Sequence, residues 1–398
     1  MKNKLNGQII LLFVIALFYL VYFILLHRFN FNLIAFMGVP VLEHSFADLR
    51  GITSGWDCQR LGYDPFLENP CDPWGRRLIY PRTWQIFSFL NIGQANTIGL
   101  GSVLAILFYC CILILAGNTL RIKEVLIWAA VSISPKILFA IERGNSDLII
   151  FILMMTAVYC YRQHWAFSSL IIYFSFTLKL YPIFGIPIAL EENKKRSLRV
   201  IAFLLAGVFI YSIMNWQELI TIHQLSEYRT RFSYGNHIFI HHFSGFGDNF
   251  AGIHLHYRYF QLISWVLTIL CIAAVYYWVK TTPIKTHAPS LKLDSFRVGS
   301  SLYLGTFLMG YTYEYKMIFL AFAIPQLLEW AKQKESPLHQ TARLCLIILI
   351  LVLWYMPKGF SSMGIFYTQK IIEDALEWGT FSVLLFLVLI SRPHWLKI

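Results

Sequence analysis

Residues 97–117 read TIGLGSVLAILFYCCILILAG, a run of 21 residues without a charged side chain. A helix needs roughly 20 apolar residues to cross the hydrocarbon core of a bilayer, so this stretch is long enough to span it. Comparable runs recur along the chain. The candidate spans are 8–27, 97–117, 124–141, 147–162, 165–180, 181–190, 200–219, 259–279, 298–312, 316–331, 343–356 and 376–391. The sequence therefore predicts an all-α polytopic membrane protein of about 12 spans, within a range of 10 to 13.

The composition agrees with this fold class. Of 398 residues, 57% are hydrophobic and 14% are charged, whereas about a quarter of a soluble domain is charged. These proportions exclude a soluble protein, a disordered chain and a secreted disulfide scaffold. The net charge of +12 would suggest nucleic-acid binding in a soluble protein. Here it is explained by basic cytoplasmic loops, so we expect membrane lipids and no nucleic acid as partners, and a single integral membrane domain over residues 1–398.

The placement of the basic residues predicts the orientation. With the N-terminus inside, the inner segments hold 18 of the 33 Lys and Arg residues. The basic run that follows Glu191 and Glu192 is the strongest inner marker, and it requires the short segment 181–190 to cross or re-enter the membrane. The apolar run after Lys2 and Lys4 is interpreted as an uncleaved first span rather than a signal peptide. We therefore expect a multi-pass protein of the cytoplasmic (inner) membrane with both termini in the cytoplasm.

Two long segments, 28–96 and 220–258, are predicted to lie on the outer side. In the first, residues 45–62 can form a short helix on the membrane surface, and the rest is rich in Pro and Gly and reads as loop. Of seven cysteines, Cys58 and Cys71 alone belong to this segment. They can form a disulfide in an oxidising compartment, and two free thiols are the alternative.

Short motifs in the first outer segment resemble those of the GT-C glycosyltransferases. An Asp near the start of the loop is followed by Gly62-Tyr63-Asp64-Pro65 and Tyr80-Pro81-Arg82. The pattern looks most like the bacterial polyprenyl-phosphate-mannose-dependent mannosyltransferases. The resemblance implies a GT-C-like bundle that transfers a hexose, with mannose as the best guess, from a polyprenyl-phosphate donor to a lipid or glycan acceptor of the cell envelope. It also implies that Asp48 corresponds to the essential Asp of the family's first outer loop.

Asp48 is the candidate catalytic residue. An inverting transfer to a hydroxyl group needs a base to take the acceptor proton as the sugar leaves its phosphate. A carboxylate at the outer membrane surface can fill that role. The structural alternative is that Ser45 or Asp48 caps the surface helix.

Charged residues near the outer ends of the predicted spans supply further candidates for substrate binding. Between the third and fourth spans these are Arg143, Asn145 and Asp147, although a tight turn with Asp147 as a helix cap would explain the same residues. Lys179 and Tyr181 belong to a phrase that resembles the Lys-x-x-Pro of this family branch. Lys179 is suited to a lipid phosphate, or it snorkels to the interface.

Glu314-Tyr315-Lys316 forms a similar outer cluster, for which an internal Glu314–Lys316 ion pair is the alternative. We expect Lys316, together with Arg143 and Lys179, to hold the donor phosphate. Lys136 lies inside the third span and is either part of a buried pair or another phosphate contact.

Six of the twelve histidines belong to the second outer segment. His237 and His241 would share one helical face, which allows a zinc site, but cysteine ligands and a His-Glu-x-x-His motif are missing. A sugar-binding or anion-binding surface that includes His241 and His242 is favoured, with a purely structural helix as a third interpretation. Nothing in the sequence requires a cofactor or a metal.

Two other functions compete with glycosyl transfer from a lipid-linked donor. A surface-polysaccharide polymerase or ligase would use similar chemistry on the outer face. A twelve-span transporter usually consists of two similar halves, and residues 1–199 do not resemble residues 200–398. No Gly-rich nucleotide-binding motif is found, which agrees with a lipid-linked donor.

Overall fold

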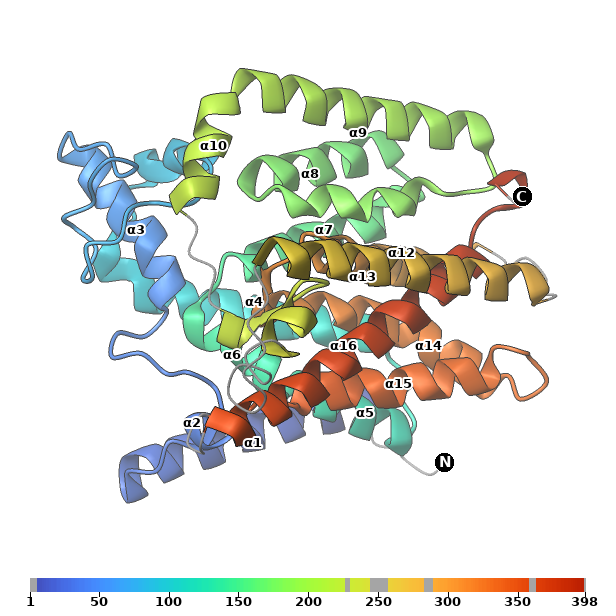
Figure 1. The fold of residues 1–398 in the computed structure, drawn as a ribbon. Helices are drawn as coiled ribbons and strands as arrows, with labels where there is room; N and C mark the ends of the chain where they lie inside the picture. The colour runs from blue at the N-terminus through green and yellow to red at the C-terminus, as the bar shows by residue number, and fades with distance from the viewer. Residues whose placement is uncertain (1–5, 226–229, 244–256, 283–288, 358–362, 397–398) are drawn as a thin grey trace.

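The computed structural model describes residues 6–225, 230–243, 257–282, 289–357 and 363–396, which form a bundle of helices with two short strands (Figure 1). Helix α13 (Leu291–Leu308) lies in the middle of the bundle and is buried without interruption from Leu293 to Phe307. It packs against α7 (Asp147–Tyr161), α16 (Met363–Ile390) and two 3-10 segments, η3 (Tyr181–Ala189) and η5 (Glu314–Ala323). This helix is the core around which the other elements are arranged.

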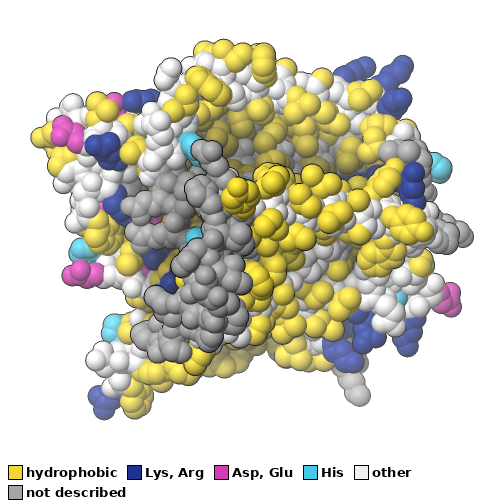
Figure 2. All heavy atoms as spheres, in the orientation of Figure 1, with side chains coloured by type: hydrophobic (Ala, Val, Ile, Leu, Met, Phe, Trp, Pro, Cys, Tyr) yellow, Lys and Arg dark blue, Asp and Glu magenta, His cyan; other side chains and the backbone are white. Residues whose placement is uncertain are grey.

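Within the part of the chain that the structure describes, four helices are long and apolar enough to cross a membrane. They are α1 (Gly7–Phe29), α4 (Thr97–Ala116), α9 (Lys194–Met214) and α12 (Tyr257–Thr281). In the apolar 18-residue stretch of each of these helices, between 61% and 89% of the residues are not buried by the protein itself. Figure 2 shows hydrophobic side chains across the middle of one face, with Lys and Arg toward its ends. An apolar surface of this extent is stable when lipid covers it.

Helices α5 (Ile122–Ser132) and α6 (Pro135–Arg143) form a broken span, with a bend of 47° between them. Pro135 is the first residue of α6. Proline has no N–H to donate, and it disfavours helical backbone at the residue before it. The chain therefore leaves one helix and starts another within the membrane-spanning stretch.

The other helical segments are shorter. They are α8 (Trp165–Leu178), α14 (Ile324–Lys332), α15 (His339–Trp354), α2 (Leu33–Phe36), η2 (Gln94–Asn96), η4 (Thr230–Phe232) and η6 (His394–Leu396). Every predicted span overlaps a helix or a 3-10 segment. By length and composition, however, the described residues supply four spans, or five if the broken pair counts as one. The helical fold is thus as expected, whereas the number of twelve spans is not confirmed.

Helix α16 begins 13 residues before its predicted start at residue 376. The helix carries Lys370, Glu373, Asp374 and Glu377, and the first three of these charges lower the local hydropathy before residue 376. All four side chains are at most 1% exposed. The helix is therefore a core element along its charged half as well.

The first outer segment is ordered by contacts with the bundle. The helix expected over 45–62 is α3 (Ala47–Arg60), and η1 (Arg82–Leu90) packs against it. Trp56 donates its indole N–H to the carbonyl of Trp84 at 2.6 Å, and Trp84 donates its own to Leu178 at 3.0 Å. This relay connects α3 through η1 to the end of α8. Cys58 and Cys71 form a disulfide, with their Cα atoms 5.7 Å apart.

The second outer segment begins within α10 (Trp216–Leu225), and its residues 226–229 and 244–256 lie outside the described residues. A short helix covers residues 238–243. Strand β1 (Ser233–Tyr234) pairs antiparallel with β2 (Thr312–Tyr313), so that Ser233 lies opposite Tyr313. This pairing joins the second outer segment to the residues that precede η5.

The disulfide leads to a direct prediction for the purified protein. Alkylation in denaturant without reductant should modify the five other cysteines and leave Cys58 and Cys71 unmodified. Prior reduction should add two further alkyl groups, as measured by intact mass. Full modification without reductant, in protein prepared from an oxidising compartment, would contradict the disulfide.

Candidate active site

Five polar side chains meet in one hydrogen-bonded network at the ends of α3, α6 and α8. Asn145 donates its amide N–H to Asp48 Oδ2 at 2.6 Å, and its Oδ1 accepts from Lys179 Nζ at 2.9 Å. Lys179 also contacts Asp147 Oδ1 at 2.5 Å, and the Tyr181 hydroxyl donates to the same oxygen at 2.6 Å. All five were candidate residues from the sequence, and the structure brings them together.

The turn between α6 and α7 lets α3 approach this network. Gly144 ends α6 with φ of +55°, in the left-handed region that glycine adopts without strain. A Cβ atom at this position would lie 2.8 Å from Cβ of Phe46, the residue just before α3. Phe46 donates its backbone N–H to the carbonyl of Glu142 at 3.1 Å. The first turn of α3, which carries Asp48, is therefore held beside Asn145.

Asp48 does not cap its helix. The N-cap of α3 is Phe46, without a side-chain capping bond, and Asp48 lies in the first helical turn. The capping interpretation of Asp48 and of Ser45 is therefore wrong. The Asp48 side chain is half-buried, and its Oδ1 has no hydrogen-bond donor among the described residues. One carboxylate oxygen is thus fixed by Asn145 while the other can accept a proton or a hydrogen bond.

Aromatic rings and a second lysine complete the site. Lys179 Nζ lies 5.4 Å from the ring centre of Tyr80 and 5.7 Å from that of Tyr315. Lys316 Nζ lies 5.3 Å from the Tyr181 ring and 5.6 Å from the Tyr315 ring. Within the described part of the chain, Lys316 makes no ion pair or hydrogen bond. Its three N–H donors are therefore available to an anion.

Tyr80 belongs to the outer loop and faces the carboxylates of the network. Burial raises the pKa of its hydroxyl, and the charges of Asp48 and Asp147 raise it further. The hydroxyl therefore remains protonated at neutral pH and can act as a hydrogen-bond donor at the site. Tyr80 and Tyr315 were not candidate residues, although both belong to motifs that the sequence analysis quoted.

Comparison with known proteins identifies the fold family. The pattern of glycosyltransferase family 87, a family of GT-C-type membrane glycosyltransferases, matches residues 84–300, which is more than half of the chain. The chain belongs to glycosyltransferase family 87. No curated protein and no solved structure matches it. The protein is therefore a membrane glycosyltransferase, and its transferase function does not rest on the fold alone.

The family match covers part of the site. Asn145, Asp147, Lys179 and Tyr181 lie inside residues 84–300, whereas Asp48, Tyr315 and Lys316 lie outside. The elements around them join both parts: α3 packs against α6, and η5 packs against α6 and α7.

Arg143 does not join the network of this glycosyltransferase. Its guanidinium forms an ion pair with the neighbouring Glu142 at 3.3 Å and lies 5.4 Å from the ring centre of Phe139. It also donates to the carbonyl of Pro40 at 3.5 Å. These contacts serve the packing of α6 against the start of the outer segment.

Glu314 also lies away from the network. It pairs with Lys370 at 3.0 Å and Lys136 at 3.7 Å, and not with Lys316, so the proposed internal ion pair is wrong. Glu314 and Lys136 are fully buried. Of the two alternatives for Lys136, the structure shows the buried pair.

The two candidate histidines belong to the helix over 238–243. His242 is buried, and its Nδ1 lies 2.8 Å from Asp374 Oδ2. His241 is half-buried, and burial lowers the pKa of its ring, as does the neighbouring His242. Among the described residues, neither histidine contacts the network around Asn145.

Sequence reasoning missed the charged face of α16, although a signal was present. Lys370, Glu373, Asp374 and Glu377 follow the spacing i, i+3, i+4, i+7, which places them on one side of a helix. Four charges on one face just before an apolar run predict a partner surface inside the bundle. Lys370, Glu373 and Asp374 lie before the predicted span 376–391 because their charges lower the local hydropathy, and only Glu377 falls inside it.

The Lys179–Asp147 pair predicts a large effect of removing one partner. The Lys179 side chain is 12% exposed and that of Asp147 is 0% exposed. Asp147→Ala should lower the free energy of unfolding by about 3 kcal/mol or more, because a nearly buried ammonium group loses its counter-ion. Denaturant unfolding of the glycosyltransferase in detergent measures this change.

The matched control is Glu329→Ala. Glu329 pairs with Lys292 at 2.9 Å, but the two side chains are 38% and 51% exposed. Its removal should cost about 0–1 kcal/mol. Equal losses in the two variants would contradict the structural importance of the Lys179–Asp147 pair.

Proposed function

We propose that this glycosyltransferase moves a sugar, namely mannose, from a polyprenyl-phosphate donor to a hydroxyl group of a lipid or glycan acceptor. The reaction would take place at the outer face of the cytoplasmic membrane. The observation that carries the proposal is the joining of Asp48 to Lys179 through Asn145, with the unpaired Lys316 beside them. A base takes up the acceptor proton in this reaction, and cations stabilise the charge that develops on the departing phosphate.

The chemistry assigns a role to each charge. The acceptor oxygen attacks the anomeric carbon of the sugar while its proton passes to Asp48 Oδ1. The bond between that carbon and the donor phosphate oxygen breaks, and the polyprenyl phosphate leaves with the bonding electrons. The negative charge that develops on the phosphate is stabilised by Lys316 and by Lys179.

The two lysines differ in their pairing, and this difference divides their roles. Lys179 already shares its charge with Asp147 and donates to Asn145. Lys179 therefore orients the Asn145 amide that holds Asp48. It also binds the donor phosphate with a charge that Asp147 has already partly neutralised. Lys316 has rings for neighbours and forms no ion pair among the described residues, which makes it the principal phosphate ligand. Arg143, which is paired with Glu142, has no part in this mechanism.

The arrangement of the bundle is consistent with an outer site. The long helix α1 begins, and α16 ends, at the end of the bundle opposite α3 and α10 (Figure 1). If both termini are cytoplasmic, as the positive-inside rule predicts, Asp48 faces the outer side. A lipid-linked donor would then reach the site from the outer leaflet.

Asp48→Asn tests the general base. Asparagine has nearly the same shape and can still accept the hydrogen bond from Asn145, but it cannot take up the acceptor proton. We expect transfer from polyprenyl-phosphate mannose to fall by about 10²–10⁴-fold in kcat while the protein stays folded.

The control for this variant is Asp57→Asn on the same helix. Asp57 forms a partly exposed pair with Arg60 at 2.6 Å and should be replaceable without a comparable loss in kcat. Full activity of the Asp48→Asn enzyme would refute the assignment of the base.

Lys316→Met tests the phosphate contact. Methionine keeps the length and apolar stem of the side chain and removes the charge. The donor KM should rise by on the order of tenfold or more because a charge-assisted contact is lost, and thermal stability should change little because no ion pair is broken. Lys292→Met, which removes an exposed lysine, should leave the donor KM unchanged.

A further inference from the structure

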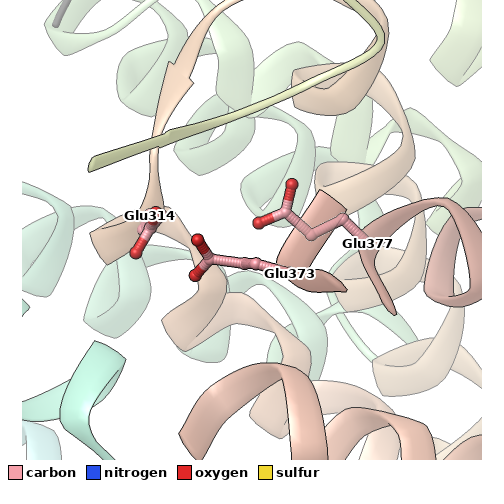
Figure 3. A group of neighbouring side chains, drawn as sticks. All are labelled: Glu314, Glu373 and Glu377. Carbon is pink, nitrogen blue, oxygen red and sulfur yellow. The ribbon is translucent and has the colours of Figure 1, made fainter. Parts of the chain in front are cut away.

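A second cluster of charged side chains is buried between η5 and α16. Glu373 and Glu377 of α16 face Glu314, the first residue of η5 (Figure 3). Oxygen atoms of the three carboxylates lie within 4.8 Å of one another. Each of the three side chains is at most 1% exposed. Three carboxylates at this spacing are a donor set that divalent cations prefer.

The ammonium group of Lys136 lies among these carboxylates. Its Nζ is 2.7 Å from Glu373, 3.5 Å from Glu377 and 3.7 Å from Glu314. Lys370 contributes a second ammonium, 2.5 Å from Glu373 and 3.0 Å from Glu314. Buried carboxylates require compensating positive charge. In this cluster, lysine side chains from α6 and α16 provide it.

The cluster connects the two elements that carry the site. Lys136 lies in the first turn of α6. Phe139, one turn later, packs against Tyr315, with the two ring centres 5.5 Å apart. The same helix continues into the turn that holds Asn145. Glu314 directly precedes Tyr315 and Lys316 in the chain. The ion pair between Lys136 and Glu314, at 3.7 Å, therefore joins the two sides of the site, and Lys370 holds Glu314 from α16 at 3.0 Å.

We propose that Lys136 is the built-in cation of this three-carboxylate centre and, through Glu314, the positioning residue for Lys316. The Lys136 ammonium takes the place that a divalent ion would take between these carboxylates. It thereby holds η5 against α6, so that Lys316 lies near the same Tyr315 ring as Lys179. The positioning part rests on the proposed phosphate-binding role of these two lysines, whereas the cation part does not.

Binding of Mn²⁺ to the purified full-length protein tests the cation part. Lys136→Ala removes the ammonium group and leaves three carboxylates with one remaining lysine. This variant should bind one Mn²⁺ per chain at micromolar concentration, seen as the loss of the free-ion signal in electron paramagnetic resonance. The wild-type protein and Lys292→Ala should not bind at that concentration. A folded Lys136→Ala protein that binds no Mn²⁺, or wild-type protein that binds it equally well, would overturn the cation role.

A charge-balanced variant tests the positioning part even if the single variant fails to fold. Lys136→Met combined with Glu377→Gln removes one charge of each sign. The double variant should fold, bind no Mn²⁺ and show a donor KM for polyprenyl-phosphate mannose raised by on the order of tenfold, with a smaller change in kcat. A folded double variant with wild-type kinetics would overturn the positioning role. If wild-type protein transfers no sugar from this donor, the proposed function fails, and the Mn²⁺ measurement still decides the cation role.

Discussion

Charge neutralisation inside an apolar bundle is the constraint on which this structure depends. An ion that is removed from water must find its counter-ion within the protein, because the apolar surroundings supply neither solvation nor screening. Lys179 meets this requirement through Asp147, and Lys136 meets it through the glutamates of η5 and α16. These pairs hold α6 against α16 and η5, and Lys179 against the start of α7. Apolar packing around α13 fills the rest.

The site is built at a junction of short elements rather than on the long helices. The broken span of α5 and α6 ends in a turn that only glycine adopts easily, and this turn brings Asn145 to Asp48. Lys179 lies where α8 gives way to extended backbone. Irregular backbone within a membrane protein is stable where it is surrounded by protein or lines a polar site. The long helices α1, α4, α9 and α12 present apolar surfaces instead, as expected of elements that face lipid.

The two charged clusters are coupled because they share α6 and η5. The network around Asn145 contains the proposed base and Lys179, and Lys316 beside it forms no ion pair among the described residues. In the three-carboxylate cluster, by contrast, every glutamate is paired with Lys136, Lys370 or both. Buried charges that are paired with each other hold the helices together. A partly buried ammonium group that forms no ion pair can instead bind an anionic ligand. The difference in pairing separates the side chains that support the site from those that can contact a substrate.

The sequence by itself determined the helical membrane class, the outer helix that carries Asp48, and most of the residues that meet around Asn145. Apolar runs and the chemistry of isolated charges are local properties, and a sequence displays them directly. Pairing is not local. Only the tertiary structure decided that Glu314 turns away from Lys316 toward Lys136 and Lys370, that Arg143 pairs with its neighbour, and that the charged half of α16 lies in the core. The outcomes for Glu314 and for α16 depend on which counter-ion another helix brings within reach, because a buried charge takes its partner from space even where another charge is close in the sequence. The partner of Arg143 is the adjacent Glu142, and here the tertiary structure decided only that this pair packs against Phe139 and Pro40 instead of joining the site.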